Sequence, residues 1–80
     1  MIVGTTTLDQ IRPGRTARIT RLAPSGSVSQ RLGEMGLVAG ATVRVVRAAP
    51  LGDPLEIEVS DYFLSLRKAE ARCVEVRETS

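Results

Sequence analysis

Apolar and polar residues alternate with a period of two in several short runs of this chain, and this pattern restricts its fold most. In Thr16 to Leu22, Ala17 and Ile19 alternate with polar residues. Leu55 to Ser60 alternates more regularly, with two glutamates on the opposite face. A period of two is typical of half-buried β-strands, in which successive side chains point to opposite faces. We therefore predict five strands, over residues 16–22, 42–48, 55–60, 62–66 and 73–77.

The short length of the chain limits how these strands can be arranged. Eighty residues are enough for one domain, expected to span residues 1–80, and such a domain buries only about 60–65% of its unfolded surface. An open flat sheet would leave backbone groups unpaired at its edges and one apolar face half covered. The pattern therefore predicts a mainly β protein, a small SH3-like antiparallel barrel of about five strands. Its predicted core consists of Ala17, Ile19, Val43, Val45, Leu55, Ile57, Val59, Leu64, Leu66, Val74 and Val76.

One short helix is predicted between the first two strands, over about residues 28–35. Ser27 and Gln30 have the three-residue spacing of a capping box, in which each side chain binds a free backbone N–H at the start of a helix. Gln30, Arg31 and Glu34 are expected to face away from the core. The face toward the core carries Val28, Leu32 and Met35, which recur at i, i+4 and i+7.

Two glycines delimit the segment that follows this helix. Gly36 comes directly after the apolar stripe, and we expect it to end the helix in the left-handed conformation that glycine adopts most easily. Leu37 would then fold back onto Leu32. Gly40 is interpreted as a second structural glycine, just before the strand that begins at Thr42.

Three further features complete the local predictions. Thr7 to Ile11 is expected to form one helical turn, with Thr7 as its cap and both apolar residues turned inward, before Pro13 ends it. Residues 68–72 are expected to form a second helical turn. Val46 interrupts the alternation of its strand and is interpreted as a contact with the helix.

Residue types that carry catalysis or bind metals are scarce. Histidine is absent, which removes the most common general base and metal ligand. Cys73 is the single cysteine, interpreted as a structural strand residue in a reducing compartment. No serine has Lys68 convincingly placed beside it as a base. Glu56 and Glu58 lie on one strand face and are interpreted as solvated charges. We therefore predict no enzyme activity, no catalytic residue, no metal ligand and no cofactor.

The charge of the chain is weakly positive. Its net charge is +2, too small an excess to argue for nucleic acid, because dedicated binders cluster Lys and Arg on one face. Arg12, Arg15, Arg18 and Arg21 share one segment and are interpreted as a solvated strand face. The longest uncharged segment, Gly36 to Val43, is far shorter than the roughly 20 residues of a spanning helix. We expect contact with a membrane only through a partner.

Several blocks of the sequence, taken together and in this order, resemble the FeoA family. They are Leu8-x-x-Ile11-x-Pro13-Gly14, Arg31-Leu32-x-x-Met35-Gly36-Leu37, Gly40, Pro50-Leu51-Gly52-Asp53-Pro54 and Leu66-Arg67-x-x-Glu70-Ala71. Together they cover nearly the whole chain. The family usually has a glycine in the turn before its aromatic strand, whereas this chain has Ser60-Asp61.

The resemblance implies a function. FeoA proteins are small cytosolic SH3-like barrels that accompany the ferrous-iron permease FeoB, a membrane protein with a cytosolic GTPase domain. A protein of this kind would be a cytoplasmic accessory or activator of ferrous iron uptake that docks on FeoB and alters its transport or nucleotide cycle. The predicted contacts are Arg31 and Glu34 on the exposed helix face and Leu51, Gly52 and Asp53 in the proline-flanked loop, because loops on rigid scaffolds often carry recognition.

Two other functions stay open at this point. The same barrel occurs as the C-terminal domain of iron-dependent repressors, which suggests a metal-sensing regulatory domain. The histidine ligands of those domains have no counterpart here, so a description as transition-metal binding would rest on kinship alone. A small nucleic-acid-binding barrel is the third hypothesis, and pairing of an exposed strand edge with a second copy leaves self-association open.

Overall fold

The computed structural model describes residues 4–22 and 27–79, which form an antiparallel sheet of six strands in the order β1-β6-β2-β3-β4-β5. The strands are β1 (Thr6–Thr7), β2 (Thr16–Leu22), β3 (Thr42–Ala48), β4 (Leu55–Val59), β5 (Tyr62–Leu66) and β6 (Val74–Glu78). A 3-10 helix, η1 (Leu8–Gln10), and two α-helices, α1 (Ser27–Glu34) and α2 (Lys68–Ala71), lie between strands.

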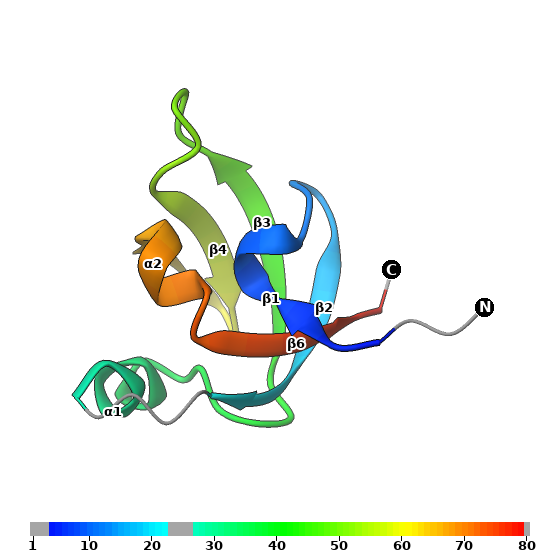
Figure 1. Cartoon of the computed structure of the whole chain (residues 1–80), viewed down its shortest axis with the longest axis vertical. Helices are drawn as coiled ribbons and strands as arrows, with labels where there is room; N and C mark the ends of the chain where they lie inside the picture. Colours follow the sequence, from blue (N-terminus) through cyan, green and yellow to red (C-terminus); the bar gives the residue numbers. More distant parts are fainter. Residues whose placement is uncertain (1–3, 23–26, 80) are drawn as a thin grey trace.

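The sheet is strongly bent. Strands β3 and β4 run along the long axis of the view in Figure 1, while β6 crosses below them almost at a right angle. Within the described residues, β1 and β5 remain as the two edges, so the sheet curls around its core without closing into a continuous ring of hydrogen bonds. This curvature lets one small sheet cover most of its own apolar face.

The predicted strands are confirmed with small changes. The bounds of β2, β3 and β5 are those expected from the alternation, and β4 ends one residue early, at Val59. The strand count was wrong by one, because Thr6–Thr7 pairs with β6 in a ladder too short to produce an alternating pattern. Because β1 precedes the strands that were predicted, the helix expected between the first two predicted strands lies between β2 and β3.

The core is aliphatic. Ten of the eleven predicted core side chains are buried, and Leu64 is half-buried against them. Helix and loop residues that the strand pattern did not include add Leu8, Ile11, Leu32, Leu37 and Ala71. Residues outside the strands therefore supply a substantial part of the interior.

Two bulges explain the irregular alternation. The β3–β4 register shifts between Val45 and Arg47, and the β2–β6 register shifts between Ile19 and Arg21. A bulge inserts one extra residue into a strand, so the inward and outward positions that follow it are shifted by one residue along the sequence. Val46 is this extra residue and is half-buried, and its contact with the helix stays a prediction.

The C-terminal end of α1 has the predicted geometry. Gly36 has a φ of +94°. The Leu37 N–H donates to the Leu32 carbonyl at 3.1 Å and the Gly36 N–H to the Gly33 carbonyl at 3.0 Å, the two bonds of a Schellman motif. Leu32 and Leu37 are both fully buried, so the contact between them that this motif favours belongs to the core. Gly40 also has a positive φ, as its structural role requires.

The start of α1 is only partly described. The helix begins at Ser27, but the Ser27 side chain lies outside the described residues, and so the predicted capping box stays a prediction. Gln30 is exposed on the outer side of the helix, as are Arg31 and Glu34. Met35 follows the helix and packs half-buried against the core, as does Val28.

One local prediction is confirmed in position only, and another was wrong. Thr7 occupies the N-cap position of η1, but its hydroxyl donates to the Asp9 carboxylate and accepts no backbone N–H. Cys73 lies in the turn before β6 rather than in a strand, and its N–H donates to the Glu70 carbonyl at 3.0 Å. The end of α2 fixes Cys73 before the β2–β6 ladder begins at Val74.

Gly36→Ala should lower the free energy of unfolding by about 1–2 kcal/mol, the cost of a left-handed backbone for a residue with a Cβ. The new Cβ would also meet the Tyr62 hydroxyl oxygen at 3.0 Å. Gly33→Ala is the matched control, since a Cβ there meets nothing within 4 Å and alanine in a helix should raise stability by about 0.5–1 kcal/mol. Thermal unfolding measures both, and shifts of the same sign would contradict this account.

Ser60→Gly should raise the free energy of unfolding by about 0.5–1 kcal/mol. Ser60 has a φ of +55°, and Val59 pairs with Tyr62 across the two-residue hairpin. A positive φ at the first central residue belongs to a turn in which glycine is strongly preferred. Asp61→Gly should instead destabilise, because Asp61 has no positive φ. Urea unfolding of both variants checks the difference in sign.

Candidate functional site

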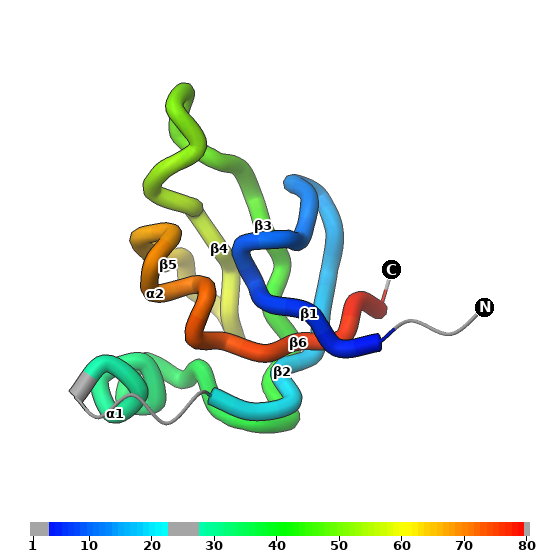
Figure 2. Tube along the Cα trace, in the orientation of Figure 1, coloured from blue at the N-terminus to red at the C-terminus, as the bar shows by residue number. Residues whose placement is uncertain are grey.

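The two regions predicted to contact a partner lie at opposite ends of the molecule. Helix α1 is at the lower end of the view in Figure 1, and the loop of residues 50–54 protrudes at the upper end. Helix α2 lies between them on the same side, as the tube in Figure 2 also shows. The predicted contacts therefore do not form one compact site by themselves.

Arg31 connects α1 to α2. Its guanidinium forms an ion pair with the Glu70 carboxylate, and 58% of the Arg31 side-chain surface stays exposed, against 16% for Glu70. Glu70 Oε1 also accepts the Arg67 N–H at 2.9 Å, which satisfies a free donor at the start of α2. Arg31 therefore already has a partner within the chain, whatever it contacts on another protein. Glu34, on the same helix, is exposed.

The proline-flanked loop is connected to α2 from the other end. Asp53 Oδ1 accepts the Lys68 N–H at 2.9 Å. Gly52, with a φ of +86°, donates its N–H to the Ala49 carbonyl at 2.7 Å. This closed turn leaves Leu51 at the tip with 96% of its surface exposed. Asp53 therefore holds the loop in place, and Leu51 is the residue that the loop presents to solvent.

Helix α2 is thus the connection between both predicted regions. Its first residues, together with Arg67 before it, are exposed between the two ends. We call this side of the molecule the α2 surface, formed by Arg31, Glu34, Leu51, Arg67, Lys68 and Ala69. The last three were not among the predicted contacts, although Arg67 is part of the Leu66-Arg67-x-x-Glu70-Ala71 block of the family pattern.

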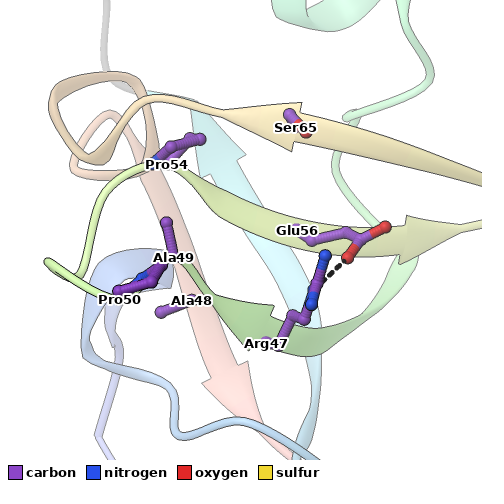
Figure 3. Close-up of a pocket in the computed structure, with 7 residues that line it drawn as sticks. All are labelled: Arg47, Ala48, Ala49, Pro50, Pro54, Glu56 and Ser65. Carbon is purple, nitrogen blue, oxygen red and sulfur yellow. Dashed lines mark hydrogen bonds and ion pairs between the residues drawn. The ribbon is translucent and has the colours of Figure 1, made fainter.

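A hollow of about 230 Å³ lies at the base of the loop. Figure 3 shows Ala49, Pro50 and Pro54 at one end of it and the ion pair of Arg47 and Glu56 at the other. Pro50, Pro54 and the 2.8 Å ion pair between Arg47 and Glu56 form its walls and limit their movement. The hollow therefore adds a preformed concave feature next to the exposed tip of the loop.

A carboxylate that the sequence analysis missed holds the opposite side of α2. Asp9 exposes only 3% of its side-chain surface and lies 3.7 Å from Arg72 Nε, just after α2. It also accepts hydrogen bonds from the Thr7 hydroxyl and, at 3.2 Å, from Gln10 Nε2. The alternation rules gave no signal for it, because η1 is only three residues long.

The described residues contain no group of three or more cysteine, aspartate or glutamate side chains placed to hold a metal ion. Cys73 is half-buried, with its Sγ 3.7 Å from the Ala69 carbonyl oxygen. Glu56 and Glu58 are engaged by Arg47 and Arg44, at 2.8 and 2.7 Å. Across residues 4–22 and 27–79, no helix has both the length and the apolar character needed to cross a bilayer.

The family model of the FeoA domain matches residues 6–78. The chain belongs to the FeoA family. A curated relative from Porphyromonas gingivalis, an Fe(2+) transport protein A/Fe(2+) transporter FeoB fusion protein, is 41% identical over 69 residues. The matched region is 86% of this chain but only 8% of the fusion protein, so the chain spans a small fraction of the length of that relative.

Solved structures of other family members share the fold. A FeoA-like protein from Clostridium acetobutylicum is 28% identical, with a TM-score of 0.91 over 100% of this chain and 92% of that one. FeoA from Stenotrophomonas maltophilia, solved with zinc and described as an SH3 domain protein, is 31% identical, with a TM-score of 0.80 over 89% and 88% of the two chains. The predicted SH3-like fold and the family are thus confirmed.

Glu70→Ala should lower the free energy of unfolding by about 1–2 kcal/mol, because it removes both the acceptor at the start of α2 and the ion pair with Arg31. Glu70→Gln keeps an acceptor oxygen and should cost less, about 0–1 kcal/mol, as should Arg31→Ala. Urea unfolding measures all three. Equal losses for the alanine and glutamine variants would show that the acceptor role is unimportant.

Proposed function

We propose that this chain is a non-catalytic accessory domain of ferrous iron uptake that docks on the cytosolic part of a FeoB-type transporter. The observation that carries the proposal is the Porphyromonas gingivalis relative, in which a domain 41% identical to this chain belongs to the same polypeptide as a FeoB transporter. Fusion raises the effective concentration of two domains toward each other, an advantage where they act through mutual contact.

The residue content of the chain supports action by contact rather than by chemistry. The chain has no histidine and one cysteine, so the usual general base and metal ligand are missing. In the described part of the chain, the carboxylates of Glu56, Glu58 and Glu70 each lie in an ion pair. We therefore infer that the domain works in the cytoplasm by changing the transport or nucleotide cycle of its partner.

The α2 surface is the docking region that the geometry favours. Leu51 is the most exposed of the large apolar side chains in the described residues, and an apolar side chain in water gains free energy when a partner buries it. The turn closed by Gly52 and the bond from Lys68 to Asp53 hold the loop in one conformation, so docking would cost little ordering entropy. The metal-sensing and nucleic-acid hypotheses remain untested predictions.

Leu51→Asp should weaken binding to the purified cytosolic part of the FeoB-type transporter from the same source about tenfold or more, because it replaces an apolar contact by a charge. The melting temperature should stay the same, since Leu51 packs on almost nothing. Phe63→Thr is the control, an exposed apolar residue on β5 outside the α2 surface. Calorimetry measures both, and equal affinities for the wild-type protein and Leu51→Asp would remove Leu51 from the interface.

A further inference from the structure

Charged residues face each other across the strands at four places in the described sheet. Three of them join opposite charges: Arg21 with Glu75, Arg44 with Glu58, and Arg47 with Glu56. Each of these three pairs forms an ion pair, at 3.1, 2.7 and 2.8 Å. At the fourth place, Arg18 on β2 lies directly opposite Arg77 on β6, so two residues of like charge are paired in the register.

Arg18 and Arg77 point outward from the sheet, because the residues on either side of Arg18 and the residue before Arg77 are buried. Both side chains are exposed. Among the residues that the structure describes, neither has a carboxylate within ion-pair distance, whereas six of the other arginines do. Like charges directly opposite each other in a sheet are unfavourable.

A second hollow lies beside this pair. Thr42 is the cross-strand neighbour of Arg18 on β3, and it lines a hollow of about 460 Å³ together with Thr16 and Ser60. The ion pair of Arg44 and Glu58 forms part of the same wall. Thr42, whose hydroxyl can donate a hydrogen bond, is therefore the cross-strand neighbour of Arg18, which has no ion pair among the described residues, and this combination suits a carboxylate oxygen.

We propose that Arg18 and Arg77 form a docking site for an acidic segment of a protein partner. The site deepens the proposed function and rests on it for the partner, the cytosolic part of the transporter. Two guanidinium groups can hold carboxylates through paired hydrogen bonds, which would offset the repulsion between them. The like-charge register is then the mark of a surface shaped for an external anion.

The charge distribution favours an acidic protein over nucleic acid or membrane. A protein that binds DNA typically neutralises roughly 6–10 phosphates, and a polybasic lipid-binding cluster contains about 4–8 basic residues. This site has two, and the neighbouring Arg21 and Arg44 are already paired with carboxylates of the chain itself. A small cationic pair of this kind matches one or two side-chain carboxylates.

The test is Arg77→Glu, which places an opposite charge across from Arg18 as in the other three pairs. The melting temperature should rise by about 2–5 °C, because a repulsive pair becomes attractive. Binding of a poly-glutamate peptide, followed by NMR titration at about 0.1 M salt, where the Debye length is only about 10 Å, should weaken about tenfold. In the wild-type protein, the largest shifts should lie at Arg18, Thr42 and Arg77. A variant that gains stability while losing binding cannot owe that loss to unfolding.

Arg12→Glu is the matched control, since it changes the net charge equally at an exposed arginine that has no ion pair among the described residues. Its peptide affinity should stay within about twofold of the wild type. Equal losses in both variants, or unchanged peptide binding in Arg77→Glu, would overturn the site. Tighter binding of duplex DNA or of vesicles rich in phosphatidylserine than of the peptide would overturn the assignment to an acidic protein.

The transporter's cytosolic part provides a separate measurement. If it binds the wild-type protein but binds Arg77→Glu equally well, the arginine site is wrong and the proposed function stands. If it does not bind the wild-type protein while the peptide still maps to Arg18 and Arg77, the proposed function fails and the acidic-segment site survives for another protein. The two proposals can therefore fail independently.

Discussion

The burial of an aliphatic core by one bent sheet is the constraint on which the rest of this structure depends. The buried core cluster of the described residues consists of apolar side chains alone, so nothing directional inside the core selects the strand register. Apolar contacts are proportional to area and have little directional preference. The strand register must therefore be selected by backbone geometry and by polar groups outside the core. The Schellman motif at the end of α1 and the two bulges provide the backbone geometry.

The outer face of the sheet provides the polar groups that select the register. Cross-strand ion pairs occur at Arg21, Arg44 and Arg47, each opposite a glutamate in register. A register slip of one residue would move these side chains to the other face of the sheet. Single exposed ion pairs contribute little stability, but several in one register disfavour alternative pairings. Against this background the pairing of Arg18 with Arg77 departs from the rule, and this departure is the basis of the proposed docking site.

Helix α2 has a comparable role for the loops. It is only four residues long, too short to be stable alone, and it is held from three directions by Arg31, by Asp53 and by Asp9 through Arg72. These contacts set the positions of α1 and of the proline-flanked loop relative to each other. A partner that contacts the loop and α1 together would therefore meet a surface whose spacing is fixed before binding, which lowers the entropic cost of association.

The sequence alone determined the strands, the helix end at Gly36 and most of the core, because these depend on periodicity and on the conformational freedom of glycine, both of which are local. Its family pattern also indicated the function class. Tertiary structure alone decided the partners of Asp53 and Glu70, the buried position of Asp9 and the meeting of Arg18 with Arg77. Arg18 and Arg77 are 59 residues apart in the chain, and no short-range pattern encodes which residues face each other once the sheet has curled.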